Sequence, residues 1–331
     1  MTVTASAPTR VDLAGGTIDI WPLYLLHPGA QTVNAALTIR ATATLTPRDD
    51  GRVVLASHDL GVTTEPLAFE ALPDDDRLPL LGRLAHAFGA RGLTVSTRSD
   101  APAGAGIAGS SALNIATTAA LARWMDRSLD DEALLDVAKN VEAQVIRVPT
   151  GLQDYRPALY GGISALEFGP FGVRRVPLGI DPAALTARLV VCYTGAPRQS
   201  GINNWDITKR RLDGDSAVAA AFDDIVAATA RLREGLDAGD WPAVGRSLAD
   251  EWTTRKRLAP GVTTPAIDAL LDRATRVGAW AGKVCGAGGG GCVFVLAPPD
   301  CVPAVRAAWQ DAGVRVLDCA IDPHGLEVTC A

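Results

Sequence analysis

Residues 102–112 combine glycines with two hydroxyl side chains, in the order Pro-Ala-Gly-Ala-Gly-Ile-Ala-Gly-Ser-Ser-Ala. A helix start leaves four backbone N–H groups without partners in the helix and carries about half a positive charge. Glycines let an anion approach the backbone, and serine hydroxyls can cap the helix or reach a phosphate or its magnesium ion. This segment predicts a phosphate-binding loop formed by Pro102, Gly104, Ala105, Gly106, Ile107, Ala108, Gly109, Ser110 and Ser111.

A plain tight turn is the simplest alternative for this glycine-rich segment, and two other nucleotide-binding patterns compete with it. The P-loop pattern needs Gly-Lys-Ser or Gly-Lys-Thr, but Gly-Lys at residues 282–283 is followed by Val284, which excludes the ordinary P-loop. Residues 104–109 match the dinucleotide fingerprint G-x-G-x-x-G, and Asp126 has the spacing of a ribose-binding acid. Residues 100–102 separate the expected strand from the first glycine, and a second helix pattern follows, which disfavours that fingerprint.

Two acidic residues after this loop are candidates for phosphate chemistry. Glu142 shares an apolar stripe with Leu135, Ala138 and Val145 at helical spacing, so its carboxylate needs a partner, either an arginine or a magnesium ion. Asp154 stands in a loop-like segment and could accept the proton of a substrate hydroxyl, although a loop aspartate is more often a cap or turn residue. The sequence leaves both pairs of alternatives open.

Two further stretches near the ends of the chain are rich in glycine. Arg10 and Asp19 flank a Gly15-Gly16 turn, and a salt bridge or a turn cap is the simple explanation for these two polar residues. Residues 286–291, in the order Gly-Ala-Gly-Gly-Gly-Gly, lie between two strand-like runs. One tight turn does not need so many glycines, so we expect the backbone there to approach a ligand closely.

The composition narrows the class of protein. The chain has 331 residues, enough for two domains, and 37 acidic against 31 basic residues give a net charge of −6 without a basic block, which disfavours nucleic acid as a partner. No signal-peptide pattern or membrane-length apolar run is present, so a cytoplasmic protein is expected. The four histidines are scattered along the sequence, which disfavours a histidine-based metal site or triad. The cysteines form no Cys-x-x-Cys pair, so we expect mostly buried free thiols at Cys192, Cys285, Cys292, Cys301, Cys319 and Cys330.

Hydrophobic periodicity predicts the elements that must position these residues. Strands are expected over residues 31–45, 52–56, 93–98, 189–193 and 314–321, and helices over 78–88, 110–125, 131–146, 216–238, 241–258, 264–278 and 299–313. Asp130 is expected to cap the helix that carries Glu142. Residues 203–206 and 209–211 are expected to form a polar loop, and a change in composition near Pro182 divides the chain into two α+β halves.

Three stretches, in order along the chain, resemble the motifs of the GHMP kinases, which include galactokinase, homoserine kinase, mevalonate kinase and phosphomevalonate kinase. Residues 8–19, with Pro-Thr-Arg, Gly-Gly and an aspartate, resemble the first motif, residues 102–112 the second and residues 286–291 the third. Residues 151–154 and 160–162 are most similar to the sugar-kinase branch of D-glycero-D-manno-heptose 7-phosphate kinase, fucokinase-like enzymes and galactokinase. The ordered motifs span nearly the whole chain.

This resemblance implies transfer of the γ-phosphoryl group of ATP to a sugar hydroxyl, often the anomeric one, with ATP and Mg²⁺ as cofactors. It implies that Ser110 and Glu142 hold the magnesium ion, and that Asp154 is the catalytic aspartate with Arg10 beside it. The substrate-binding residues that it implies are Gly15, Gly16, Asp19, Gly151, Asp154, Tyr160, Gly161, Gly288 and Gly289.

The resemblance also implies a two-domain GHMP kinase fold, with a ribosomal-S5-like N-terminal domain over residues 1–185 and a ferredoxin-like C-terminal domain over residues 186–331. The expected partner is a small sugar or sugar phosphate, with no nucleic acid or membrane, in a monomer or homodimer. An NAD-dependent oxidoreductase and a catalytically silent nucleotide- or sugar-binding relative are the alternatives.

Three departures from the family pattern concern the identity of the sugar more than the chemistry. Ala108-Gly109 stands where the family has Gly-Ser, so one hydroxyl is missing from the loop. Residues 17–18 are Thr-Ile where this branch often has Gly-Thr, and residues 155–157 are Tyr-Arg-Pro in place of a Gln-Tyr-Ala type continuation.

Overall fold

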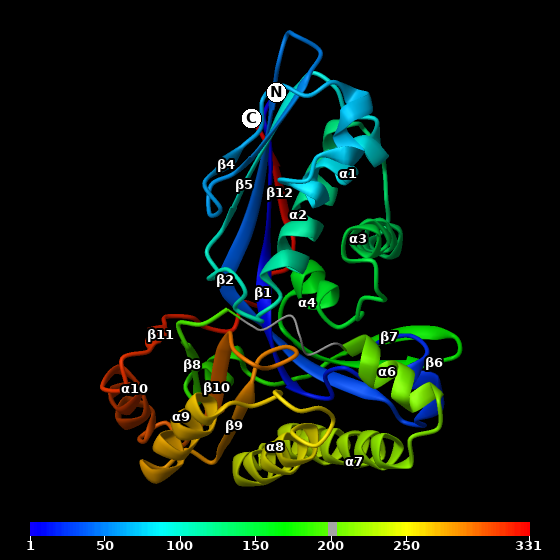
Figure 1. Cartoon of the computed structure of the whole chain (residues 1–331). Coiled ribbons are helices and arrows are strands. Elements are labelled where there is room, and N and C mark those ends of the chain that lie inside the picture. Colours follow the sequence, from blue (N-terminus) through cyan, green and yellow to red (C-terminus); the bar gives the residue numbers. More distant parts are fainter. Residues whose placement is uncertain (198–203) are drawn as a thin grey trace.

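The computed structural model describes residues 1–197 and 204–331 and contains two β-sheets (Figure 1). The first sheet has eight strands, and the second has four. Helices pack against both sheets, which confirms the predicted α+β class. The strands of the first sheet are β1 (Val3–Ala14), β2 (Gln31–Pro47), β3 (Val53–Ser57), β4 (Val62–Thr63), β5 (Leu93–Ser99), β6 (Ile163–Gly169), β7 (Gly172–Pro177) and β12 (Glu327–Cys330).

In the view of Figure 1, the long strand β2 runs from the upper part of the molecule, which holds the helices of residues 79–160, into the lower part, which holds the second sheet. It pairs antiparallel with β1, with β6 over Gln31–Ala35 and with β5 over Ala41–Pro47. Among the strands of the described residues, only β3 and β5 pair in parallel. A dinucleotide-binding fold needs a mostly parallel sheet, so this topology contradicts the oxidoreductase alternative.

The C-terminal strand β12 returns to the first sheet and pairs with β1, so that both chain ends lie side by side at the top (Figure 1). The sequence analysis did not predict β12, a strand of only four residues, all of them exposed. The predicted division near residue 185 falls within α5 (Pro182–Thr186), just before β8 (Leu189–Tyr193).

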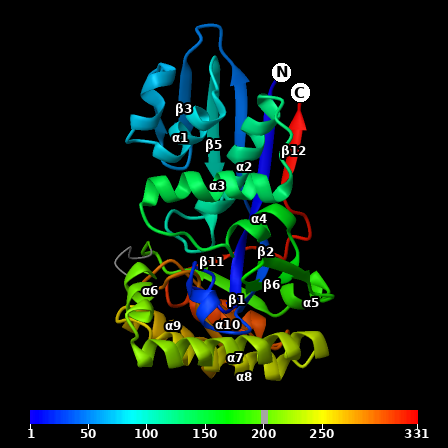
Figure 2. The same ribbon diagram turned by 90° about the vertical axis from the view of Figure 1, so that its right-hand side faces the viewer.

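Helices cover one face of the upper part of the first sheet (Figure 2). The faces that they share with the sheet are apolar: Ile115 and Leu121 belong to the same buried cluster as Leu45 and Val95. Asp130 caps its helix as predicted, since its side chain accepts a hydrogen bond from the amide of Ala133. These elements are α1 (Pro79–Phe88), α2 (Gly109–Trp124), α3 (Asp131–Ile146) and α4 (Tyr155–Tyr160), with the short 3₁₀ turns η1 (Leu23–Leu26) and η2 (Phe69–Asp74) elsewhere.

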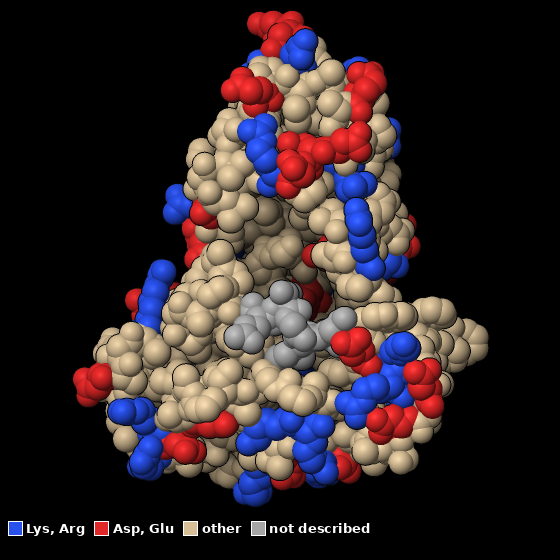
Figure 3. Space-filling view, viewed as in Figure 1, with Lys and Arg blue, Asp and Glu red and all other residues tan. Residues whose placement is uncertain are grey.

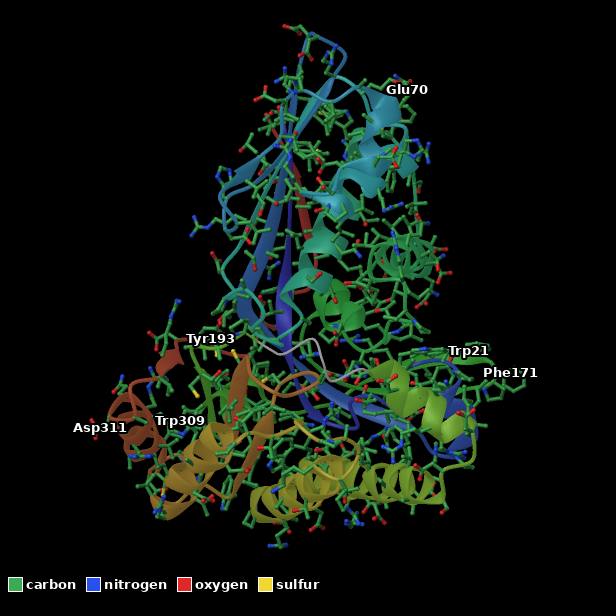
Figure 4. All side chains as sticks on the ribbon, viewed as in Figure 1. Trp21, Glu70, Phe171, Tyr193, Trp309 and Asp311 are labelled. Atoms are coloured by element: carbon green, nitrogen blue, oxygen red, sulfur yellow. The ribbon has the colours of Figure 1, made fainter. Side chains whose placement is uncertain are left out.

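The second sheet has the antiparallel order β11-β8-β10-β9. Phe294 and Trp309 are fully buried in this lower part, while Trp21 and Phe171 lie at its opposite, exposed edge (Figure 4). The remaining elements are β9 (Ala281–Val284), β10 (Cys292–Leu296), β11 (Arg315–Leu317), α7 (Ser216–Ala238), α8 (Trp241–Arg255), α9 (Pro265–Arg276) and α10 (Val302–Gln310).

The predicted polar loop at residues 203–206 and 209–211 was wrong from Asn204 onward, and Asn203 lies outside the described residues. Helix α6 (Asn204–Leu212) forms there because Ile207 and Thr208 are buried, and three basic residues in its last turn complement the helix dipole. All six cysteines are free thiols. The expected burial is confirmed for Cys192, Cys285 and Cys292, whereas Cys301 and Cys319 are half-buried and Cys330 is exposed on β12. Among the helices in the described ranges, none has the length and apolar character to cross a membrane.

Candidate active site

The predicted phosphate loop, residues 102–111, follows β5 and includes the first turn of α2 in the structure. Its backbone is left-handed at Gly106 (φ 75°) and at Ala108 (φ 61°). Ala108 occupies the N-cap position, and alanine has no side-chain acceptor, so the suggestion that Ser110 and Ser111 cap this helix was wrong. The first amide groups of α2 therefore remain available to an anion.

The glycine strip, residues 286–291, lies directly behind this loop. The amide of Cys292 donates to the carbonyl oxygen of Ala105 at 2.7 Å. A Cβ atom added to Gly106 would lie 2.5 Å from the carbonyl oxygen of Cys285, and one added to Gly291 would lie 2.7 Å from that of Ala105. Both glycines are thus required by backbone-to-backbone packing between the two parts of the molecule.

Two glycines of the strip also contact the loop before α9. A Cβ atom on Gly288 would lie 2.3 Å from the carbonyl oxygen of Val262, and the amide of Gly289 donates to that same oxygen. The hydroxyl of Tyr193, labelled in Figure 4, donates to the carbonyl oxygen of Ala103 in the phosphate loop. Substrate binding by Gly288 and Gly289 stays a prediction.

Arg10 links the phosphate loop to Asp154. Its guanidinium is buried, and two of its groups donate to Oδ1 of Asp154, Nη2 at 2.6 Å and Nε at 3.0 Å. Its Nη1 donates to the carbonyl oxygen of Gly106 at 3.0 Å. Burial alone would lower the pKa of Arg10, but the carboxylates of Asp154 and Asp12 raise the pKa above its usual value, so the guanidinium stays charged.

Asp19 lies beside the loop that carries Asp154. Its Oδ2 accepts a hydrogen bond from the amide of Gln153 at 3.0 Å, and a Cβ atom on Gly151 would lie 2.2 Å from that oxygen. Burial first, and then the negative charge of Asp154, raise the pKa of Asp19 to about 6. The structure therefore brings Asp19, Gly151 and Asp154 together, and their roles toward a substrate stay predictions.

Glu142 of α3 faces the start of α2. Its Oε1 accepts a hydrogen bond from the hydroxyl of Ser110 at 3.3 Å, and its Oε2 accepts from Thr150 and from Tyr155. Within residues 1–197 and 204–331, no arginine or lysine pairs with Glu142, so the arginine alternative has no support. Burial raises the pKa of Glu142, while the hydrogen bonds from Tyr155 and Ser110 oppose that rise.

The donor set at Glu142 suits a hard cation. Ser110 is exposed and supplies a hydroxyl, and Glu142 supplies a carboxylate, so both offer oxygen. In the described part of the chain, no group of three or more His, Cys, Asp or Glu side chains could hold a metal ion alone. Magnesium commonly takes one or two protein ligands together with substrate phosphates and water, and this pair of residues fits that pattern.

The remaining predicted substrate residues have other partners. A Cβ atom on Gly15 would lie 2.2 Å from the carbonyl oxygen of Gln31, so this glycine is required by packing. The guanidinium of Arg175 lies 4.8 Å from the ring centre of Tyr160 and donates to the carbonyl oxygen of Gly161. Their roles toward a substrate stay predictions.

The sequence analysis missed a buried charge cluster between β1 and the glycine strip. Lys283 is completely buried, and its Nζ lies 2.8 Å from Glu251 and 3.2 Å from Asp12. The amide of Gly286 donates to Asp12, and Arg255 donates to the carbonyl oxygen of Gly286. Burial would raise the pKa of Asp12, but Lys283 and Arg10 lower the pKa below its usual value.

Gly16 lets the side chains of this cluster lie close to the backbone, because a Cβ atom there would lie 2.6 Å from Nη1 of Arg255 and 2.7 Å from Oδ2 of Asp12. One sequence signal was present: Asp12 follows Arg10 by two residues, so that both side chains point to the same face of β1. The space-filling view (Figure 3) shows the surface hollowed between the upper and lower parts, with acidic side chains visible in the hollow.

The family models for the N-terminal and C-terminal domains of GHMP kinases match residues 79–162 and 232–315, slightly more than half of the chain. The chain belongs to the GHMP kinase family. Its fold is therefore the two-domain GHMP kinase fold, and the protein is a phosphotransferase with an alcohol group as acceptor.

Among curated relatives of this GHMP kinase, D-glycero-alpha-D-manno-heptose 7-phosphate kinase from Campylobacter jejuni is 28% identical over 90% of each chain. Galactokinase from Mycobacterium tuberculosis is 27% identical over 95% of each chain. Among solved structures, a D-glycero-D-manno-heptose 1-phosphate kinase from Bacteroides thetaiotaomicron has a TM-score of 0.80 at 23% identity, covering 99% of each chain. Galactokinase from Lactococcus lactis in complex with galactose has a TM-score of 0.80 at 19% identity, covering 98% of this chain and 95% of that one.

Proposed function

We propose that this GHMP kinase transfers the γ-phosphoryl group of ATP to a hydroxyl of a sugar or sugar phosphate, with magnesium as cofactor. The observation that carries this proposal is the buried Arg10 guanidinium, which binds Asp154 with two groups and the phosphate-loop carbonyl of Gly106 with a third. The names of the heptose 7-phosphate kinase and galactokinase relatives support a sugar as acceptor. The resemblance to the GHMP sugar kinases makes the anomeric hydroxyl the first candidate.

The phosphate loop and the start of α2 bind the phosphates of ATP. Phosphoryl transfer has a loose transition state, so positioning and charge neutralisation supply most of the acceleration. The uncapped amide groups of α2 and the left-handed turns at Gly106 and Ala108 direct backbone N–H groups toward an anion.

Asp154 orients the acceptor hydroxyl. Both bonds from Arg10 end on Oδ1, so Oδ2 is the oxygen that accepts the hydroxyl proton. The guanidinium holds this carboxylate in place beside the phosphate loop, because it also donates to the carbonyl oxygen of Gly106. Asp154 therefore holds the hydroxyl in line and takes its proton late, after the bond to phosphorus has begun to form.

Ser110 and Glu142 would hold the magnesium ion. When bound, magnesium neutralises negative charge on the phosphate oxygens of ATP. Glu142 has no cationic partner in the described ranges, and its Oε1 already faces the Ser110 hydroxyl.

Asp19 binds sugar hydroxyls in this proposal. It is buried next to Asp154 and packed against Gly151, so a side chain at position 151 would displace its carboxylate. A deprotonated Asp19 accepts hydrogen bonds from hydroxyls on the carbons next to the one that is phosphorylated. A cytoplasmic location and a monomeric or homodimeric state stay predictions.

The test is ADP release from Mg-ATP against free hexoses, 6-deoxyhexoses, heptoses and their phosphates, with homoserine and mevalonate as non-sugar acceptors. Turnover on one sugar, followed by NMR of the product, identifies both the acceptor and the hydroxyl. Turnover on homoserine or mevalonate alone would overturn the sugar assignment. ATP binding without turnover on any acceptor would favour the silent relative, for which the missing hydroxyl at Gly109 is the motivating feature.

A further inference from the structure

The two carboxylate oxygens of Glu142 have different surroundings. Oε1 faces the exposed hydroxyl of Ser110, at the start of α2. Oε2 points the other way and accepts hydrogen bonds from the hydroxyls of Tyr155 and Thr150, which lie 3.1 Å from each other. One oxygen is therefore held by the protein, and the other is directed toward the phosphate loop.

Tyr155 is suited to hold this oxygen because its own position is fixed. It is fully buried, and it belongs to the large apolar cluster beneath the first sheet, together with Ala138 of α3. A phenol hydroxyl on a packed ring has little freedom to move away from its acceptor. The carboxylate of Glu142 is also nearly buried, so it needs such a partner.

Tyr155 also follows Asp154 directly, at the start of α4. Asp154 turns toward Arg10 on β1, while Tyr155 turns toward Glu142 on α3. One helix start therefore fixes the position of the acceptor-orienting carboxylate relative to the metal-binding carboxylate. Position 155 is also a departure from the pattern that the family resemblance implies, where a glutamine-type continuation is usual.

We propose that Tyr155 is a positioning residue for magnesium: its hydroxyl donates a hydrogen bond to Oε2 of Glu142, so that the carboxylate offers only Oε1 to the metal. The proposal rests on the proposed function, which assigns Glu142 to magnesium. Magnesium demands near-ideal octahedral geometry and accepts a carboxylate through one oxygen, whereas calcium takes more ligands and tolerates both oxygens of one carboxylate. Tyr155 thus sets the preference for magnesium over calcium.

The test compares Tyr155→Phe with the wild type by calorimetric titration of ATP without metal, with magnesium and with calcium. Phenylalanine keeps the buried ring and removes only the hydroxyl. We expect metal-free ATP affinity to stay unchanged and the gain in affinity from magnesium to fall by about 10–100-fold, as is usual for a residue that orients a metal ligand. The gain from calcium should fall less, because a freed carboxylate can bind calcium with both oxygens. Magnesium and calcium gains that both equal those of the wild type would overturn the proposal, and so would a larger magnesium gain.

Glu142→Gln and the double variant Glu142→Gln with Tyr155→Phe separate this proposal from the proposed function. If Tyr155 acts through Glu142, the double variant has the same magnesium gain as Glu142→Gln alone. A further loss in the double variant would give Tyr155 a separate role and overturn the proposal. If Glu142→Gln keeps the wild-type gain in ATP affinity from magnesium, the metal site of the proposed function is wrong. If Glu142→Gln loses that gain and Tyr155→Phe keeps it, only the positioning role of Tyr155 is wrong.

Thr150→Val keeps the proposal testable if Tyr155→Phe does not fold. This variant removes the longer hydrogen bond to Oε2, 3.4 Å, and leaves the Tyr155 ring in place. We expect a smaller loss of the magnesium gain in the same direction. An intact magnesium gain in Thr150→Val, together with an unfolded Tyr155→Phe, would make the contact structural and overturn the positioning role.

Discussion

Replacing Gly106 by alanine tests whether the phosphate loop depends on the glycine strip behind it. The added Cβ would lie 2.5 Å from the carbonyl oxygen of Cys285, where ordinary contacts begin at 3.4 Å. That oxygen belongs to the backbone between β9 and β10, so no flexible side chain can move aside. The phosphate loop must instead retreat by about 0.9 Å, the difference between these two distances.

The expected cost has two parts. A left-handed φ of 75° costs an alanine about 1–2 kcal/mol relative to glycine. Forcing an extra methyl group into a close-packed contact costs about 1–3 kcal/mol more. The free energy of unfolding should therefore fall by about 2–5 kcal/mol, and turnover should fall by about 100-fold, because a displacement of about 1 Å misaligns the transferred group.

Gly89→Ala is the matched control, because Gly89 has a φ of 73° and no atom within 4 Å of an added Cβ. It ends α1, away from the candidate site, so it carries the backbone strain without the collision. Unfolding in denaturant and calorimetric titration of ATP should show a loss of about 1–2 kcal/mol and normal ATP affinity for Gly89→Ala. Equal stability losses and normal ATP affinity in both variants would refute the contact between the loop and the strip.

Three other variants test the site. Asp154→Asn should lower turnover by about 10²–10⁴-fold while ATP still binds, and full turnover would remove Asp154 from the mechanism. Asp19→Asn should raise the free energy of unfolding more at pH 7.5 than at pH 4. The pKa of Asp19 is raised to about 6 from an ordinary 3.8, so the contribution of its protonated form to stability is present below about pH 4 and is lost as the pH rises through about 6. Equal thermal shifts at both pH values would contradict this pKa. Lys283→Met removes the nearest cation from the buried carboxylates of Asp12 and Glu251 and should cost about 3–5 kcal/mol in unfolding experiments. A loss below about 1 kcal/mol would show that the Lys283 ion pairs do not stabilise the fold.

The elements around the phosphate loop were predictable because their signals are local. The alternation over residues 93–98 and the apolar positions over residues 110–125 specify β5 and α2, and the glycines between them specify a loop. Asp130 was a predictable cap for the same reason, since an N-cap depends only on the residues of its own helix turn. The strand β12 was not predictable, because a stretch of four exposed residues carries little hydrophobic signal and the strand is held by hydrogen bonds to β1.

The partners of the site residues were less predictable than their positions. The pattern on α3 showed that Glu142 needs a partner, but an arginine and a metal ion satisfy that need equally well in a sequence. Only the packing of α3 against α2 and α4 shows which hydroxyls its carboxylate contacts. Nothing in the sequence indicated that Lys283 is buried, because lysine is almost always exposed. Its burial is visible only in the folded structure, where β9 pairs with β10.

The division of the chain near residue 185 separates groups that the structure joins. Every residue predicted to bind ATP precedes that division, yet the loop they form is held from behind by Cys285 and Cys292 of the second part. Arg10 is likewise tied to both parts, because it bonds Gly106 and lies 3.7 Å from Asp12, which Lys283 neutralises. Since the loop geometry depends on these contacts, the phosphate site belongs to the interface between the two parts, although its sequence motif lies within one of them.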